Sequence, residues 1–167
     1  MKRSIVFIIL IIFLELTATS QNVRYKPGFS AVFDSVTGKG LLKQCSRTIP
    51  KKISGYWSIS QIDIDTLEQN YSNLDSLTAN GCCQFGVKDN VLKNLAVQYA
   101  GVIVNKRKYI YINAFPISEI EWMKKHQPTF DPAKQPIIVC DGGTSYWGIL
   151  FDVETRKFSS LSFNGVA

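Results

Sequence analysis

The sequence has few residues of the kinds that build metal and catalytic centres. It contains one histidine, His126, two methionines and four cysteines. The neighbours Cys82 and Cys83 cannot easily both reach one tetrahedral ion, so a zinc site lacks suitable ligands. We therefore expect no metal site and no other cofactor.

The sequence also lacks a hydrophobic run long enough to cross a membrane. The apolar run from Ile5 to Leu14 holds about ten residues, whereas a membrane-spanning helix needs about twenty. Two basic residues precede this run and the small residues Ala18-Thr19-Ser20 follow it, which is the pattern of a secretory signal peptide. We predict cleavage of residues 1–20 before Gln21 and a secreted or periplasmic product that is not an integral membrane protein.

No stretch of the sequence concentrates charge of one sign. The chain carries 19 lysines and arginines against 13 aspartates and glutamates, a formal net charge of +6. The basic residues are scattered, which is typical of a solvated surface rather than of a nucleic-acid groove. We predict no nucleic-acid partner, and the modest positive charge favours an acidic protein or an anionic envelope component.

All four cysteines lie in the predicted mature chain, and export to an oxidising space makes disulfide bonds the default. A bond between the neighbours Cys82 and Cys83 would strain the short loop that it closes. We therefore predict two bonds that join Cys45 and Cys140 to the Cys82–Cys83 pair, in either order. Each bond would stabilise the fold by about 2–4 kcal/mol.

The mature chain of about 147 residues fits one domain. We find no internal repeat and no low-complexity tract. Residues 21–55 show little periodicity, so we predict an irregular N-terminal arm with one short strand over residues 30–36. Residues 56–167 form the predicted single α+β domain.

A stripe of apolar residues at three- and four-residue steps predicts one long helix after Ser60. Ser60 is the predicted N-cap, and Asn80-Gly81 is the predicted stop, so the helix has about four turns. Trp57, just before the cap, is placed to fold back on the stripe. The stripe comprises Ile64, Leu67, Tyr71, Leu74 and Leu77.

Strand patterns dominate the second half of the chain. Residues 98–104 and 108–114 predict a hairpin joined by Asn105-Lys106-Arg107. Tyr109, Tyr111 and Asn113 would share one face of the second strand. Residues 116–126 predict a short helix with acidic residues at its start and basic residues at its end.

Three further strands are predicted at residues 136–140, 146–152 and 157–164. A bulge at Ser159-Ser160 would bring Phe158 into phase with Leu161. The predicted fold is α+β: an antiparallel sheet of about five strands, one long helix packed on a face and one additional short helix. This order is similar to that of cystatin-like and related helix-on-sheet domains, in topology only.

The C-terminal part carries a spaced motif. Cys140-Asp141-Gly142-Gly143 is followed by Tyr146-Trp147-Gly148, Phe151-Asp152 and Phe163-Asn164-Gly165. The motif resembles the C-terminal signature of a family of small exported bacterial proteins without an assigned activity. The resemblance covers residues 45–165 and implies a shared fold and export. It implies no functional residue, because a fold does not fix an activity.

Cys140 would need a base to act as a nucleophile. His126 lies in a Lys-Lys-His run at the end of a predicted helix, where a basic residue favours the helix C-terminus. A bridged sulfur cannot attack, so we predict that Cys140 is not catalytic. The next residues, Asp141-Gly142-Gly143, form either a tight turn or a site that presents a carboxylate and free amides to a ligand.

The carboxylates do not form an evident catalytic pair. Glu119 and Glu121 are two positions apart on a predicted helix and point different ways, and Asp63 and Asp65 have the same spacing. A hydrolase would have to combine distant residues, such as Asp141 with Asp152. This pattern disfavours an enzyme without excluding one.

The aromatic residues outnumber what a core of this size needs. Some would line an exposed sheet face or groove, where flat rings with polar tips suit protein or sugar contacts; the alternative is that they are half-buried strand residues. The candidate binding residues are Asp141, Gly142, Gly143, Tyr146, Trp147, Tyr109 and Tyr111.

These observations favour a non-catalytic exported binding protein of the inhibitor or immunity type. Its partner would be a protein or an anionic envelope component. Two alternatives remain: a small secreted hydrolase or ligand-binding enzyme that uses Asp141 and nearby tyrosines, and a structural component of the envelope. A carboxylate pair in a deep pocket would favour the enzyme, whereas an exposed aromatic patch would favour the binding protein.

Overall fold

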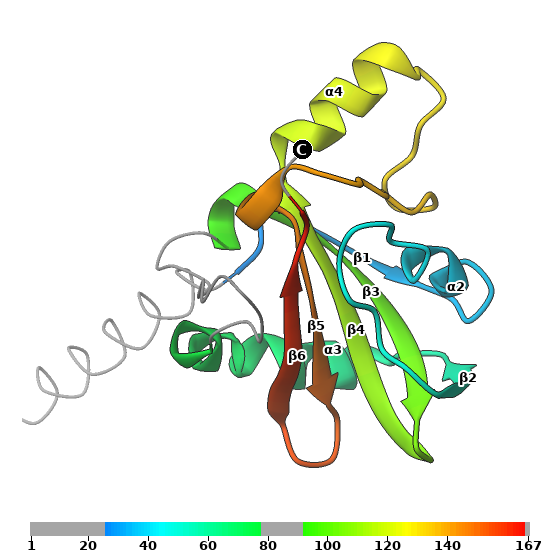
Figure 1. The fold of residues 1–167 in the computed structure, drawn as a ribbon, viewed down its shortest axis with the longest axis vertical. Coiled ribbons are helices and arrows are strands. Elements are labelled where there is room, and N and C mark those ends of the chain that lie inside the picture. Colours follow the sequence, from blue (N-terminus) through cyan, green and yellow to red (C-terminus); the bar gives the residue numbers. More distant parts are fainter. Residues whose placement is uncertain (1–25, 78–91, 166–167) are drawn as a thin grey trace, which may run out of the picture.

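A computed structural model describes residues 26–77 and 92–165, with a six-stranded sheet at its centre (Figure 1). The predicted signal peptide and both Cys82 and Cys83 lie outside these residues. The strands are β1 (Phe29–Phe33), β2 (Ile53–Trp57), β3 (Leu95–Val104), β4 (Arg107–Pro116), β5 (Trp147–Asp152) and β6 (Lys157–Phe163). The helices are α2 (Gly38–Leu41), α3 (Gln61–Gln69) and α4 (Ser118–His126), with 3-10 turns η1 (Tyr71–Ser76), η2 (Leu92–Asn94) and η3 (Gly143–Ser145).

The sheet is mixed, so the prediction of an antiparallel sheet of about five strands is wrong. Its order is β1-β3-β4-β5-β6, with β2 also paired to β3. β1 runs parallel to β3 along residues 96–100, and β2 runs antiparallel to it along residues 101–104. β1 overlaps the short strand that we predicted at residues 30–36 of the N-terminal arm. The arm is nevertheless part of the sheet, and the predicted domain boundary at residues 55 and 56 falls inside β2.

The predicted hairpin is confirmed as β3 and β4. Asn105 and Lys106 form its two-residue turn with positive φ angles of 49° and 65°, as a tight hairpin turn requires. Tyr111 packs on one face of the sheet and Ile110 and Ile112 on the other. The hairpin thus contributes to two cores.

The predicted long helix is broken into two pieces. Ser60 caps α3 through a reciprocal capping box with Asp63, as its sequence suggests. The α-helix ends at Gln69 because the side chain of Asn70 donates to the Thr66 carbonyl, 2.8 Å away, and asparagine side chains compete in this way with helical bonds. The chain continues as η1, and the predicted stop at Asn80-Gly81 lies outside the described residues.

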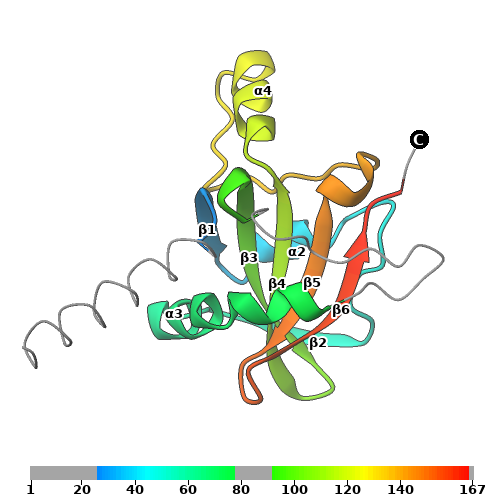
Figure 2. The same cartoon turned by 90° about the vertical axis from the view of Figure 1, so that its left-hand side faces the viewer.

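The apolar stripe of this segment nevertheless packs as predicted. Ile64, Leu67, Tyr71 and Leu74 are buried against the sheet, and Trp57 packs beside them. Figure 2 shows α3 lying across one face of the sheet. We call this the α3 face.

The C-terminal strands are confirmed in part. β5 and β6 form, and the predicted bulge occurs where Ser160 has a φ of 58° and the register shifts. The bulge lets Phe158 and Leu161 share the core of the α3 face. Residues 136–140 are not a strand, because side chains rather than a neighbouring strand bind their backbone: Gln98 accepts from the Ile137 amide at 2.9 Å.

The opposite face of the sheet carries two smaller cores. One includes Tyr111 and Leu150 and is covered by α2. The other lies at the end of the sheet, where Ile120 of α4 packs on Phe115. Residues 43–52, which have no regular structure, join α2 to β2 (Figure 1), and we call them the strap.

The predicted short helix is confirmed as α4, which projects from the end of the sheet (Figures 1 and 2). In the described part of the chain no helix has the length and hydrophobicity that a membrane crossing demands.

Candidate functional site

The predicted binding residues lie in three separate places. Asp141, Gly142, Gly143 and Tyr146 lie together around η3. Trp147 is 1% exposed in the core of the α3 face, and the structure does not bring it to the others. Tyr109 and Tyr111 belong to the opposite face, where Tyr109 is half-buried and Tyr111 is 2% exposed.

Residues 141–146 form a tight turn, which we call the glycine corner. Gly142 and Gly143 have φ angles of 87° and 59°, which glycine adopts without strain. The Gly143 amide donates to the Gly165 carbonyl at 3.0 Å, and the Asn164 side chain donates to the Asp141 carbonyl at 2.9 Å. These backbone groups are already hydrogen-bonded to residues 164 and 165, so they are not free to bind a ligand.

Tyr146 connects the glycine corner to α4. Its hydroxyl donates to the Glu119 carboxylate at 2.7 Å. Burial raises the pKa of Tyr146, and the hydrogen bond to Glu119 and the negative charges of Glu119 and Asp141 raise it further. The phenol is therefore held neutral and cannot serve as a base near neutral pH.

Cys45 and Cys140 form a disulfide bond with each other, so the predicted pairing with Cys82 and Cys83 is wrong. Their Cα atoms lie 5.1 Å apart, because the strap crosses the sheet beside the glycine corner. Both cysteines are exposed. A disulfide bond fits a protein of an oxidising compartment, and it leaves Cys140 without a nucleophilic thiol.

The opposite face of the sheet also contains a buried polar cluster that was not predicted from the sequence. Gln98 and Asn113 face each other across β3 and β4, and the Asn113 amide donates to Gln98 at 3.3 Å. Arg47 of the strap donates to the Asn113 side-chain oxygen. The signal in the sequence is one polar residue in each of two apolar strands, at positions that the hairpin register brings opposite each other.

Gln98 and Asn113 are fully engaged by the loop that follows α4. Gln98 donates to the carbonyls of Pro132 and Gln135, both at 2.9 Å. Asn113 donates to the Ile137 carbonyl at 2.9 Å. These bonds fix residues 132–137 on the sheet independently of the disulfide bond.

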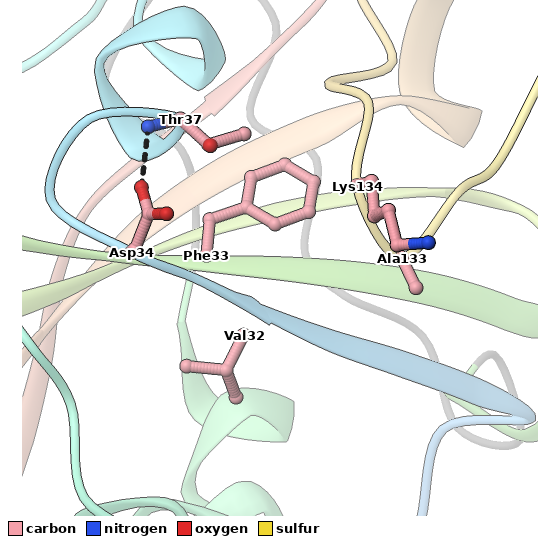
Figure 3. Close-up of a pocket in the computed structure, with 6 residues that line it drawn as sticks. All are labelled: Val32, Phe33, Asp34, Thr37, Ala133 and Lys134. Atoms are coloured by element: carbon pink, nitrogen blue, oxygen red, sulfur yellow. Dashed lines mark hydrogen bonds between the residues drawn. The ribbon is translucent and has the colours of Figure 1, made fainter.

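A shallow groove of about 390 Å³ lies at the end of β1. Figure 3 shows Phe33 between the Asp34–Thr37 turn and the segment of Ala133 and Lys134. Asp34 accepts from the Thr37 amide at 2.6 Å, and this bond lowers the pKa of the carboxyl group. Lys134 pairs with Asp131 at 3.2 Å. The charged groups of the groove are thus engaged within the protein.

The exposed end of α4 carries an aromatic side chain beside positive charge. Trp122 is 55% exposed, and its ring stacks on His126 with centroids 4.3 Å apart. Lys124, Lys125 and His126 form the last turn of the helix. Only Ile120 of this helix is buried, so the helix keeps most of its surface in solvent.

The comparisons with known proteins identify no relative. No family model matches the sequence, and neither the curated proteins nor the solved structures include one that is similar to this chain. Within residues 26–77 and 92–165, no three histidine, cysteine, aspartate or glutamate side chains are grouped as a metal ion would require.

Proposed function

We propose that this chain is an exported, non-catalytic binding protein that uses α4 to bind an acidic surface of a partner protein. The observation that carries the proposal is the 55% exposure of Trp122 on a helix that projects from the body. Tryptophan is enriched among the residues that dominate binding energy at interfaces. Exposure of a large aromatic ring to solvent is therefore a stronger indication of a binding surface than exposure of a polar residue.

The positive C-terminal end of α4 supports an acidic partner; the acidic residues Glu119 and Glu121 lie in its first turn. Lys124, Lys125 and His126 follow Trp122 within one turn, and the whole chain carries a formal net charge of +6. Complementary charge around an aromatic anchor steers association and makes it depend on salt. An acidic protein surface offers the Trp122 ring an interface to pack against and offers the basic residues opposite charges to pair with.

Export is part of the same proposal. The predicted signal peptide over residues 1–20 and the disulfide bond between Cys45 and Cys140 support it together. Membership in the family of small exported proteins, and a likeness to cystatin-like domains, stay proposals that rest on the sequence motif and on element order.

The arrangement of carboxylates does not favour the alternative enzyme. Asp141 and Glu119 both lie near the Tyr146 hydroxyl, but Glu119 accepts its hydrogen bond and Asp141 is exposed. Asp152 lies in β5 and pairs with Arg107 at 2.9 Å. Each of these carboxylates therefore has a separate place in the fold.

The test is affinity capture followed by a measured affinity. Mature protein is used to capture partners from its own cell envelope, the captured protein is purified, and the dissociation constant is measured for wild type, Trp122→Ala and Lys124→Glu/Lys125→Glu. We expect Trp122→Ala to weaken binding at least about 30-fold, as truncation of a central interface residue does. The charge reversal should weaken binding most at low salt.

Two variants serve as matched controls. Ile62 is 77% exposed on α3, so Ile62→Ala removes exposed apolar surface elsewhere. Lys51→Glu/Lys52→Glu makes the same charge change on the strap. Equal losses in the control and α4 variants would refute α4 as the binding element. Capture of anionic lipid instead of protein, or cleavage of a generic ester or glycoside by a protein that captures nothing, would refute the proposed function.

A further inference from the structure

Arg47 is a buried positive charge that has no negative partner among the described residues. It is 6% exposed, and among the described residues no acidic side chain forms an ion pair with it. Its neighbours are neutral: the Asn113 oxygen and the Tyr111 ring, whose centroid lies 6.0 Å from the guanidinium carbon. An unpaired buried charge costs several kcal/mol, so this arrangement needs a reason other than stability.

Two polar atoms of this pair are buried without a hydrogen bond of normal geometry, namely the Nε atom of Arg47 and the hydroxyl of Tyr111. The two side chains attract each other, but no described group completes the hydrogen bonding of either atom. Native proteins leave few such groups unsatisfied. The N–H groups of the guanidinium and the O–H group of the phenol are hydrogen-bond donors that lie close together. A planar carboxylate is the acceptor that a guanidinium binds best.

The strap carries Arg47 and closes this site against Tyr111 of β4. Arg47 is the one buried residue among residues 43–52, so little apolar surface holds the strap down. Its other attachments to the described part of the chain are few: Thr48 donates to Ser162 at 2.9 Å, Ser46 accepts from Gly165 at 3.2 Å, and Gln44 donates to the Ile137 carbonyl at 3.4 Å. A segment with few buried contacts opens locally at low free energy once it is released.

The disulfide bond between Cys45 and Cys140 is the covalent attachment of the strap. Both cysteines are exposed, so a thiolate can reach the bond. The glycine corner stays in place without it, because Asn164 and Gly165 bind its backbone. Cleavage therefore frees the strap and leaves the sheet intact.

We propose that the strap, through Arg47, closes a carboxylate-binding site that lies between Arg47 and Tyr111 of β4, and that cleavage of the Cys45–Cys140 bond by a dithiol lets the strap move far enough from the sheet to admit a carboxylate between the two side chains. In this step the bond between the two sulfur atoms breaks and each becomes a thiol. The dithiol supplies two electrons and two protons and becomes a disulfide. The unpaired charge of Arg47 favours movement of the strap away from the sheet, and a carboxylate bound between Arg47 and Tyr111 then supplies the missing negative charge.

Chemical labelling of arginine tests the opening. Oxidised protein, reduced protein and the Cys45→Ser/Cys140→Ser variant are treated with phenylglyoxal, and modification of Arg47 is followed by mass spectrometry. We expect Arg47 to react at least about 30-fold faster after loss of the bond, because a segment with few buried contacts opens locally at low free energy once its covalent attachment is gone. Arg156 is exposed and should react equally in all three samples.

Hydrogen exchange separates opening from unfolding. The amides of β3 and β4 should remain protected in the Cys45→Ser/Cys140→Ser variant while those of the strap exchange faster. Protection of Arg47 from labelling in the reduced protein would refute opening. Loss of protection throughout the sheet would also refute it, because the strap would then be part of the cooperative fold.

Carboxylate binding is tested on the opened protein with sodium succinate and with a short polyglutamate peptide, against sodium chloride at equal ionic strength. We expect saturable protection of Arg47 by a carboxylate but not by chloride. Protection by succinate indicates a small free ligand, and protection by the peptide alone indicates an acidic protein segment. No protection by either probe would refute the site.

A substitution distinguishes a ligand-binding residue from a structural one. Arg47→Met in the oxidised protein should leave the free energy of unfolding unchanged or raise it, because an apolar side chain of similar volume removes the buried charge. A clear fall in stability would show that Arg47 is retained for the fold. Neither result depends on α4, so this proposal and the proposed function fail separately.

Discussion

At the scale of single residues, the tyrosines show how far burial changes a side chain. The hydroxyl groups of Tyr71 and Tyr99 lie 2.5 Å apart in the core of the α3 face. Burial raises the pKa of both phenols above the ordinary value near 10, and their closeness adds repulsion between the ionised forms at Tyr71. Burial likewise raises the pKa of Tyr111, although Arg47 opposes the shift.

These shifts predict alkaline unfolding. A phenol with a raised pKa in the folded state keeps its proton where the unfolded chain loses it, so stability is complete below pH 10 and falls as the pH rises above it. In a titration followed by tyrosinate absorbance, we expect Tyr71, Tyr99, Tyr111 and Tyr146 to ionise only together with loss of structure. Ionisation of all seven tyrosines near pH 10, without unfolding, would contradict the burial described here.

Gly142 illustrates a position where one added methyl group has a defined effect. Its φ of 87° is unfavourable for other residues, and a Cβ there would lie 2.4 Å from the Tyr146 ring. Gly142→Ala should lower the free energy of unfolding by at least about 1–2 kcal/mol, measured by denaturant titration. The neighbouring control is Gly165→Ala, whose Cβ meets Ser46 at an ordinary 3.7 Å; equal effects would contradict the argument.

At the scale of elements, the features that could be predicted are those that depend on interactions between residues close in the sequence. The capping box of Ser60 and Asp63, the hairpin turn at Asn105 and Lys106 and the bulge at Ser160 are encoded within a few residues. The end of α3 at Gln69 was missed because one side-chain bond from Asn70 outweighs the continuing apolar stripe. Tertiary burial keeps that stripe in place in a 3-10 turn as well as it would in an α-helix.

The capping box yields a quantitative prediction. Ser60 accepts from the Asp63 amide at 3.3 Å, and Asp63 accepts from the Ser60 amide at 2.9 Å. Ser60→Ala should lower the free energy of unfolding by about 1 kcal/mol, whereas Ser60→Asn should restore most of the loss. Ser58→Ala, two residues before the cap and exposed, is the control; an equal loss there would show that the box contributes nothing specific.

At the scale of the whole molecule, the missed features are those that join distant segments. β1 pairs with β3 across more than sixty residues, and no pattern within residues 29–33 specifies a parallel partner. The Arg47 cluster brings together the strap, two strands and the loop after α4. The glycine corner could be predicted as a turn from its composition, but its link to Glu119 depends on where α4 packs.

The disulfide pairing depends on the same long-range geometry. The sequence allowed three pairings of four cysteines, and reasoning from the adjacency of Cys82 and Cys83 selected the wrong ones. Cys45 and Cys140 meet because β1, α2 and the strap bring residue 45 across the opposite face to the glycine corner. Only the arrangement of the sheet places these two residues together, 95 positions apart in the sequence.

That separation predicts a large contribution of the bond to stability. A loop of about a hundred residues closed by a disulfide restricts the unfolded chain by about 4–5 kcal/mol. Cys45→Ser/Cys140→Ser should therefore lower the free energy of unfolding by about this amount in denaturant titrations, with the sheet still folded in buffer. Peptide mapping of unreduced wild type should recover residues 45 and 140 in one linked fragment. A linked fragment that joins either of them to residues 82 or 83 would contradict the bond between Cys45 and Cys140.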